Sequence, residues 1–190
     1  VLRGYWRCPN PSCGKVWGSD DPIGIFNPLD KIPDWACECG NNRKLVYEEL
    51  PVRSDPAYNF YGHCDAVVDV RGTSFEVEGG HNVFVADMKT INDDSFSDLK
   101  EPKNEHVIQV HIYMWLLGLG AAVVLYENKN TQYMKELFVK RNDAIIEQIK
   151  KQALWMRAVL EARKLPARPN GFSKAKFPCY SCEFAGACFA

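Results

Sequence analysis

The sequence predicts an α/β fold with a small cysteine-rich module before it and a cysteine-containing tail after it. Short runs rich in β-branched residues alternate with two segments of helical length. Seven of the eight cysteines form two clusters, one near each end of the chain. The length of 190 residues is sufficient for one compact domain with a small appendage. We therefore expect the central part of the chain to form a sheet and the two clusters to flank it.

The predicted strands follow one another from Lys44 onward. Each is a run of apolar and β-branched residues bounded by turn residues, with one turn at 54–56 and another at Gly79-Gly80. The predicted strands are 45–52, 60–70, 83–90, 121–127 and 133–139.

Two helices are predicted between and after these strands. Residues 105–119 are apolar over a helical length and end at a glycine pair. Asp143 caps an amphipathic helix that continues to about residue 164 and stops before Pro166. The acidic and polar segment 92–104 is predicted to be a mobile loop.

The overall composition excludes two classes of protein. The chain is 46% hydrophobic and 25% charged, which is typical of a folded soluble domain. Its longest apolar stretch, residues 107–124, is interrupted by polar and glycine residues and predicts no membrane span. A net charge of −1 excludes nucleic-acid binding by bulk positive charge, although residues 141–176 carry nine basic and only three acidic side chains.

The first cysteine cluster reads Cys8-Pro-Asn-Pro-Ser-Cys13-Gly and then Cys37-Glu-Cys39-Gly. Glycine after each pair lets the backbone turn tightly and aim N–H groups at a thiolate sulfur. Four thiolates from two such turns are typical of a tetrahedral zinc site, although the second pair is more closely spaced than usual. We predict a zinc-ribbon-like module over residues 1–43, with these four cysteines as ligands.

The second cluster comprises Cys179, Cys182 and Cys188 in an aromatic tail. Three ligands do not complete a zinc or four-iron site, which normally takes four. The fourth ligand would come from elsewhere, and both Cys64 and a residue upstream of Val1 are candidates. The alternative is three buried thiols that bind no metal.

Disulfide bonds are the other possible use of so many cysteines. No segment resembles a signal peptide, and Cys37 and Cys39 are too close for a scaffold of long closed loops. We therefore expect a reducing, cytoplasmic location with metal-bound thiolates.

Two predicted strands carry acidic residues where a buried strand would not normally keep them. Strand alternation places Asp65 and His63 on one face and Cys64 on the other. Asp87 and Lys89 likewise share a face of their strand. If the two strands pair, Asp65, Asp87 and Lys89 converge.

Two neighbouring carboxylates suit a hard divalent cation, and an adjacent lysine can polarise or deprotonate a bound water. This combination can hydrolyse a phosphodiester. The alternative, a surface ion pair between Asp87 and Lys89, does not explain acids inside apolar strands. On the following helix Gln109 and Tyr113 lie on one face, with His106 one turn earlier. Taken by themselves, Gln109 and Tyr113 are interpreted as core polar groups whose hydrogen bonds are satisfied.

The ordered set Gly62-x-x-Asp65, Asp87-x-Lys89 and Gln109-x-x-x-Tyr113 resembles the three motifs of the RecB-like branch of the PD-(D/E)XK nuclease superfamily. The closing Cys179-x2-Cys182-x5-Cys188 resembles the iron–sulfur motif of the CRISPR adaptation exonucleases and of AddB-type nucleases. The resemblance covers the chain from about residue 45. The cysteine module before it is similar to a zinc ribbon of some bacteriophage members.

The resemblance implies a restriction-endonuclease-like core over residues 44–190, with a central mixed β-sheet flanked by helices and an iron–sulfur motif at 177–190 that holds a [4Fe-4S] cluster. It implies one or two Mg²⁺ or Mn²⁺ ions held by Asp65, Asp87 and the backbone carbonyl of Met88. Lys89 would orient or activate the attacking water. Gln109 and Tyr113 would position the nucleic-acid strand.

In the family, the first iron–sulfur cysteine lies on a helix upstream of the first motif, and that helix also carries an acid or histidine near the metal. The sequence shows no such helix before Asp65. The helix precedes Val1, or else a ribbon cysteine supplies the fourth ligand. Glu48 and Glu49 are candidates for the additional acid.

These features predict a metal-dependent DNA nuclease, more specifically an exonuclease on single-stranded or end-frayed DNA. It would work with recombination or replication proteins in a bacterial or phage-infected cell. The basic segment 141–176 would follow the DNA backbone, and Trp155, Phe172, Phe177 or Tyr180 would stack on bases. Two alternatives remain: a non-catalytic nucleic-acid-binding or assembly protein centred on the ribbon, and a structure-selective endonuclease on branched DNA.

Overall fold

The computed structural model describes residues 2–3, 5–17, 37, 39–40, 46–74, 78–164, 166–168, 171–176 and 178–189. The chain divides into two compact units. We call Val1–Gln152 the sheet unit and Ala153–Ala190 the tail unit.

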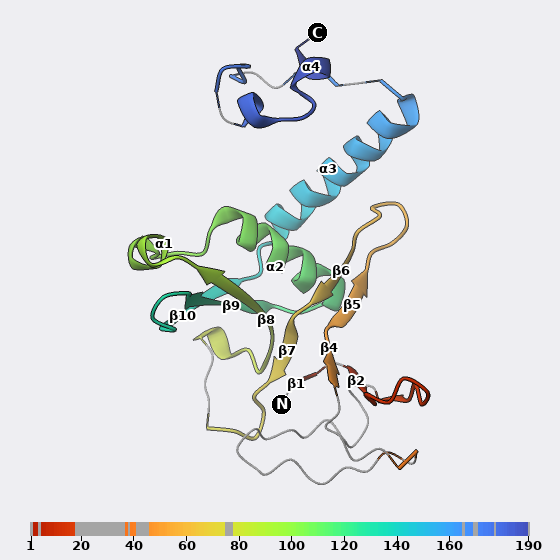
Figure 1. Cartoon of the computed structure of the whole chain (residues 1–190), viewed down its shortest axis with the longest axis vertical. Coiled ribbons are helices and arrows are strands. Elements are labelled where there is room, and N and C mark those ends of the chain that lie inside the picture. The colour runs from red at the N-terminus through yellow and green to blue at the C-terminus, as the bar shows by residue number, and fades with distance from the viewer. Residues whose placement is uncertain are drawn as a thin grey trace. The chain divides into compact units, whose positions relative to one another are not determined.

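The sheet unit is built on a five-stranded sheet with the strand order β1-β7-β8-β9-β10 (Figure 1). Neighbouring strands are antiparallel except for β8 and β9, which are parallel. A parallel pair requires a crossover connection, and here α1 and α2 lie in that connection. The elements are β1 (Leu2–Arg3), β7 (Ala66–Asp69), η2 (Glu78–Gly80), β8 (Val83–Ile91), α1 (Asp93–Asp98), α2 (Asn104–Leu117), β9 (Ala121–Asn128) and β10 (Met134–Lys140). The predicted central mixed sheet with helices is confirmed.

Both faces of this sheet are covered by apolar side chains. On the side of α2, the cluster includes Val85, Val110 and Val124, while Phe84 and Ala121 belong to a cluster on the other side. Two covered faces explain why the central strands are apolar at successive positions rather than at alternate ones. The helix α2 ends at Gly118, whose left-handed φ of 67° turns the following Leu119 N–H back to the Met114 carbonyl at 2.9 Å.

Residues 93–98 form α1, so the loop predicted for this part of 92–104 is wrong. Asn92 caps the helix by accepting a hydrogen bond from the Ser95 N–H at 3.1 Å. Phe96 is buried in the core, and the Lys135 Nζ donates to the Leu99 carbonyl at 3.1 Å. The cap is local, but the contacts that hold the helix against β10 come from distant sequence.

Three further strands and a hairpin lead into the main sheet. The strands β2 (Tyr5–Arg7), β3 (Val16–Trp17) and β4 (Val46–Glu48) form a small sheet in the order β3-β2-β4. The hairpin consists of β5 (Leu50–Arg53) and β6 (Tyr61–Cys64). The predicted strand 45–52 is thus divided between two sheets. The predicted boundary between residues 43 and 44 stays a prediction, because strands from its two sides pair with each other. The strand β4 lies in the small sheet with β2, and β1 lies in the main sheet with β7.

The helix α3 (Asp143–Ala162) confirms the second predicted helix and runs past the boundary between the units. The predicted cap is wrong by one residue, since Asp143 lies in the first turn and the Asn142 Oδ1 accepts the Ala144 N–H at 2.9 Å. The rest of the tail unit contains η3 (Cys179–Ser181) and α4 (Ala185–Cys188), and the Arg168 guanidinium lies 4.3 Å from the centre of the Phe189 ring. Over the described ranges, no helix combines the length and the apolar character that crossing a membrane requires.

Candidate active site and metal centres

Asp65 lies at the point where the chain passes from the β5–β6 hairpin into the main sheet. The residue before it ends β6, which pairs with β5, and the residue after it begins β7, where Ala66 lies opposite Ala86 of β8. The Asp65 Oδ2 accepts a hydrogen bond from the Met88 N–H at 2.7 Å. This side chain therefore bridges the gap that opens between β6 and β8.

Because the strand is interrupted at Asp65, its neighbours do not lie on the faces that alternation predicts. Strict alternation places Cys64 and Val67 on opposite faces, but both pack in the apolar cluster on the α2 side. His63, predicted to share a face with Asp65, is exposed. The bend between the two strands reorients β6 relative to β7.

Asp87 is a fully buried carboxylate in the central strand β8. The Lys89 Nζ lies 2.8 Å from its Oδ2, and the Lys89 side chain is 21% exposed. Among the residues that the structure describes, the Lys89 ammonium group is the nearest partner of this carboxylate, and no other group donates a hydrogen bond to either Asp87 oxygen. Burial raises the pKa of Asp87; Lys89 opposes this effect and the nearby Asp65 adds to it. The structure thus brings Asp65, Asp87 and Lys89 together.

These groups fit a divalent cation. A buried carboxylate without hydrogen bonds requires a compensating partner, and a second carboxylate beside it supplies the hard oxygen ligands that Mg²⁺ or Mn²⁺ prefers. The N–H and C=O of one strand residue point to the same edge. Because the Met88 N–H faces Asp65, its carbonyl faces this side as well. Asp65, Asp87 and the Met88 carbonyl therefore suit the ligand set that the resemblance implies.

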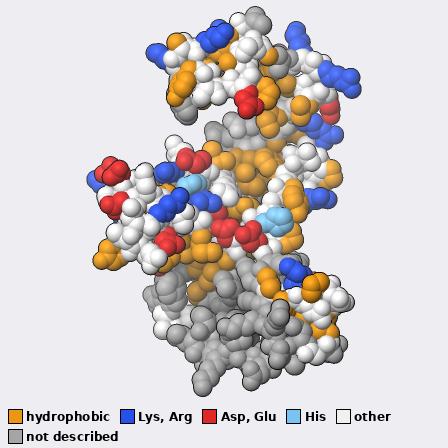
Figure 2. All heavy atoms as spheres, viewed as in Figure 1, with side chains coloured by type: hydrophobic (Ala, Val, Ile, Leu, Met, Phe, Trp, Pro, Cys, Tyr) orange, Lys and Arg blue, Asp and Glu red, His pale blue; other side chains and the backbone are white. Residues whose placement is uncertain are grey.

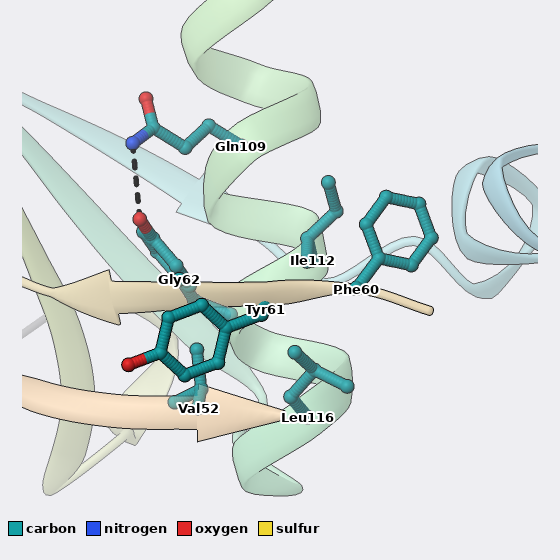
Figure 3. Close-up of a pocket in the computed structure, with 8 residues that line it drawn as sticks. Val52, Phe60, Tyr61, Gly62, Gln109, Ile112 and Leu116 are labelled. Carbon is teal, nitrogen blue, oxygen red and sulfur yellow. Dashed lines mark hydrogen bonds between the residues drawn. The ribbon is translucent and has the colours of Figure 1, made fainter. Parts of the chain in front are cut away.

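Gln109 and Tyr113 support the strand that carries Asp65. The Tyr113 hydroxyl donates to the His63 carbonyl at 2.7 Å and accepts from the Gln109 Nε2 at 3.1 Å. Burial raises the pKa of Tyr113, with smaller contributions that include the charge of Asp87. Both side chains line a pocket of about 110 Å³ between the hairpin and α2 (Figure 3).

His106 also lies near the site, although the sequence pattern assigned no role to this residue. Its Nδ1 lies 2.6 Å from the hydroxyl of Tyr126, which is buried on β9 opposite Lys89 and accepts the Lys103 N–H at 3.0 Å. Burial, followed by the charge of Lys89, lowers the pKa of His106. The available signal was its spacing, since His106 precedes Gln109 by one helical turn.

The four N-terminal cysteines form the predicted cluster. Their sulfur atoms all lie within 4.8 Å of one another, with Cys8 to Cys39 at 3.8 Å and Cys13 to Cys37 at 3.5 Å. Tetrahedral zinc with Zn–S bonds of about 2.3 Å separates its sulfur ligands by about 3.8 Å. The distances therefore fit zinc in this cluster.

The turns around these cysteines have the geometry expected of a zinc ribbon. Gly14 and Gly40 adopt φ values of 62° and 77°, which favour glycine. The backbone N–H groups of Asn10 and Lys15 hydrogen-bond the sulfurs of Cys8 and Cys13, respectively, and each bond favours a thiolate.

The C-terminal cysteines differ from this arrangement. Cys179 is buried, whereas Cys182 and Cys188 are exposed. Over the described part of the chain, the N-terminal four make up the one group with metal-binding spacing. Cys64 is fully buried in the sheet unit, where its thiol donates to the Ala66 carbonyl at 3.2 Å and burial raises its pKa to about 12. This satisfied thiol is poorly suited to be a fourth ligand.

The remaining candidate residues are less informative. Glu49 is exposed, as are Trp155, Phe172 and Tyr180. Phe177 and the side chain of Glu48 lie outside the described residues. Figure 2 shows acidic, basic and histidine side chains mixed over the visible, described surface of the sheet unit, rather than a face of one sign.

Comparison with known proteins supports the family suggested by the motifs. The sequence matches the PD-(D/E)XK nuclease superfamily over residues 27–189, beginning within the cysteine module. No curated protein matches.

Two solved structures are similar to the chain at low identity. A crystal structure of SSO0001 has 18% identity and a TM-score of 0.38, and the match covers 67% of this chain and 50% of that one. An alkaline exonuclease from Laribacter hongkongensis has 15% identity and a TM-score of 0.34, with 60% and 59% coverage. The chain therefore spans little more than half the length of these structures. Because the superfamily match covers most of its residues, the chain belongs to the PD-(D/E)XK nuclease superfamily.

Proposed function

We propose that this protein is a divalent-metal-dependent nuclease that hydrolyses phosphodiester bonds in DNA, acting as an exonuclease on single-stranded or end-frayed DNA. The single observation that carries the proposal is the buried Asp87 carboxylate, which has Lys89 against it and Asp65 beside it. Family membership supports the same chemistry. Such a carboxylate is costly in a folded protein unless it serves a ligand.

In this proposal Asp65, Asp87 and the Met88 carbonyl hold one or two Mg²⁺ or Mn²⁺ ions. When bound, such a metal lowers the pKa of a water and neutralises charge on the phosphate. Lys89 is fixed by its contact with Asp87 yet remains partly exposed, so its ammonium group can contact the scissile phosphate. There it would orient the attacking water and stabilise the negative charge of the transition state.

Tyr113 and Gln109 act on the site through its backbone in this mechanism. Their hydrogen bonds fix the carbonyl of His63, two residues before Asp65, so α2 sets the position of that carboxylate. Gln109 also lines the adjoining pocket and is available to position the DNA strand. Because the pKa of His106 is lowered, its imidazole is neutral at pH 7 and adds no second positive charge beside Lys89.

The cysteine clusters have structural roles in this proposal. Cys8, Cys13, Cys37 and Cys39 bind zinc and hold the ribbon together. The three tail cysteines contribute to a [4Fe-4S] cluster whose fourth ligand is not among them. The basic segment 141–176 follows the DNA backbone during recombination or replication.

Cleavage of defined DNAs tests the catalytic proposal. End-labelled linear single strands, linear duplexes and a closed circular single strand are incubated with Mg²⁺, Mn²⁺ or EDTA. We expect metal-dependent degradation of the linear DNAs and no cleavage of the circle. Asp87→Asn and Lys89→Ala should each reduce cleavage by at least about 100-fold.

Two controls make the result specific. Glu136→Gln removes an exposed acid on β10 and should cleave at the wild-type rate. Lys89→Ala should retain DNA binding. Wild-type cleavage by Lys89→Ala would refute the role of the lysine, and a wild type that binds but never cuts would favour the binding-protein alternative. Cleavage of the circle would indicate an endonuclease.

A further inference from the structure

His106 lies in the first turn of α2, over the face of the sheet that carries the acidic site. Its Nδ1 lies 2.6 Å from the hydroxyl of Tyr126. Tyr126 lies opposite Lys89 in the parallel pair β8–β9 and packs in the apolar cluster on the α2 side. Because Asp87 and Lys89 alternate along β8 with Val85, a member of the same cluster, their side chains also face α2. All four polar side chains therefore share one face of the sheet.

The contact with Tyr126 determines which ring nitrogen of His106 carries the proton. Tyr126 is fully buried, and burial raises the pKa of its hydroxyl, so this group keeps its proton. The hydroxyl oxygen already accepts the Lys103 N–H at 3.0 Å. Within the described residues the remaining partner of the hydroxyl is the His106 Nδ1, which must accept its proton. A neutral imidazole whose Nδ1 accepts a hydrogen bond carries its own proton on Nε2.

The Nε2–H of His106 is thus a donor available to a substrate. Among the described residues the His106 side chain makes one hydrogen bond, and that bond uses Nδ1. The side chain is half-buried rather than enclosed, so a substrate can reach the ring. Burial and the charge of Lys89 lower the pKa of His106, which keeps the imidazole neutral at pH 7. A fixed neutral N–H beside a lysine is suited to an anionic oxygen.

The other role open to a histidine beside two carboxylates is to bind the metal. Ligation through Nε2 requires a lone pair there and therefore a proton on Nδ1. The hydroxyl proton of Tyr126 would then have no acceptor in a buried position, which is costly. Ligation through Nδ1 is blocked by the same hydroxyl. The contacts of His106 therefore favour a donor over a metal ligand.

We propose that His106 is a further catalytic residue, whose Nε2–H donates a hydrogen bond to a non-bridging oxygen of the phosphate that is cleaved. The inference rests on the proposed nuclease function and adds a second group that contacts the phosphate. Lys89 supplies positive charge, and His106 supplies a directed neutral donor that keeps its proton throughout. The bond strengthens as negative charge develops on the oxygen in the transition state. Tyr126 is a positioning residue, since it sets the tautomer of His106.

The tautomer is tested by long-range proton–nitrogen NMR of the protein labelled with isotopic histidine, in EDTA at neutral pH. The chain has four histidines, and the signals of His106 are those missing from His106→Asn. We expect the wild-type ring to be protonated on Nε2 and not on Nδ1. Tyr126→Phe, which keeps the ring but not the hydroxyl, should show both tautomers. A wild-type ring protonated on Nδ1 would overturn the proposal.

Two amide substitutions separate the functions of the two ring nitrogens. His106→Gln has an amide that reaches the position of Nε2, so it keeps a donor toward the phosphate. The shorter His106→Asn keeps an acceptor for the Tyr126 hydroxyl but loses the distant donor. We expect single-turnover cleavage with Mg²⁺ to fall about 10- to 100-fold in His106→Asn and to be largely restored in His106→Gln.

A purely structural role predicts the reverse order, because His106→Gln disturbs the Tyr126 contact more than His106→Asn does. That order, or wild-type cleavage by His106→Asn, would overturn the proposal. His81→Asn is the matched control, since it removes an imidazole that stacks on Phe138 at the other face of the sheet. This variant should cleave at the wild-type rate.

Metal binding provides a readout that does not depend on cleavage. The dissociation constant for Mn²⁺, measured by electron paramagnetic resonance without DNA, should be the same in His106→Asn as in the wild type. Asp87→Asn should weaken Mn²⁺ binding by at least about tenfold. An equal weakening in His106→Asn would identify His106 as a metal ligand and overturn its assignment as a donor.

DNA titration separates this inference from the nuclease proposal. When an oligothymidylate is added to the wild type in EDTA, the Nε2–H signal of His106 should shift, because the phosphate becomes its acceptor. A wild type that shows this shift but never cuts DNA would contradict the nuclease proposal alone. A signal that does not move at saturating DNA would overturn the contact between His106 and the phosphate.

Discussion

Replacing Asp87 by Asn should stabilise the metal-free protein while abolishing its response to Mg²⁺. The carboxylate is fully buried and neither oxygen has a hydrogen-bond partner in the described structure. The amide has the same shape, so the substitution leaves no cavity and exchanges a buried charge for a buried neutral polar group. Lys89 loses its partner, but at 21% exposure its ammonium group can turn toward water.

The size of the effect follows from the difference between an unsatisfied buried neutral group, which costs about 1–3 kcal/mol, and an unsatisfied buried charge, which costs more. The loss of the Lys89 contact offsets part of this gain. We expect a net stabilisation of about 1–2 kcal/mol, which for a chain of this size is an increase in Tm of about 2–8 °C. Thermal and urea unfolding in EDTA measure it.

The pH dependence gives a second measure of the same carboxylate. Burial raises the pKa of Asp87 in the folded state above its ordinary value of 3.8. The ionised form therefore destabilises the fold above the folded pKa, and this penalty is relieved as pH falls from that pKa toward 3.8. The stability difference between Asp87→Asn and the wild type should shrink over the same interval.

Magnesium should act on the wild type alone and offset most or all of the variant's advantage. At a concentration ten times its dissociation constant, Mg²⁺ should stabilise the wild type by about 1.4 kcal/mol and leave the variant unchanged. The reasoning is refuted if Asp87→Asn is less stable than the wild type in EDTA, because Asp87 would then be a satisfied structural residue. An equal response of both proteins to Mg²⁺ would contradict its role as a ligand.

Three further predictions address other parts of the sheet unit. Tyr113→Phe removes the donor to the His63 carbonyl, so the free energy of unfolding should fall by about 1–2 kcal/mol. Single-turnover cleavage should slow by a larger factor than DNA binding weakens, and an unchanged cleavage rate would contradict the positioning role of Tyr113. Cys13→Ser should lower the zinc content measured by atomic absorption and lower the Tm, whereas retention of a full equivalent of zinc would exclude this cysteine as a ligand. In Gly120→Ala the new Cβ would lie 2.7 Å from the His81 Cε1, and displacing that half-buried ring should cost no more than about 1 kcal/mol in urea unfolding, a penalty that His81→Ala in the same chain should relieve.

Local signals in the sequence were sufficient to predict most elements of the sheet unit. The apolar run at 121–127 and the glycine stop at 118 correspond to β9 and to the end of α2. The glycine after each cysteine pair predicted turns that the structure contains. Each of these features depends on neighbours in sequence, or on a burial pattern that the sequence displays directly.

The site was less predictable where it depends on distant contacts. The acids could be identified from their presence in apolar strands. The alternation of side chains does not predict the bend at Asp65, because the bend arises where β6 pairs with β5 while β7 pairs with β8. The role of Tyr113 toward the His63 carbonyl required the docking of α2 across the hairpin. For α1 a local signal existed, since Asn92 precedes two acids in the first turn, but the acidic content suggested a loop.

The short strand β4 connects the ribbon to the hairpin that leads into the acidic site. It pairs with β2 of the ribbon and continues, after Glu49 alone, into β5 of the hairpin. The partner of β5 is β6, whose last residue precedes Asp65. Oxidation or chelation at the cysteine cluster would remove the support for β4 and loosen the hairpin that sets the acid's position. A change in the redox or metal status of the cluster would thereby alter the position of Asp65, although none of the four thiols belongs to the acidic site.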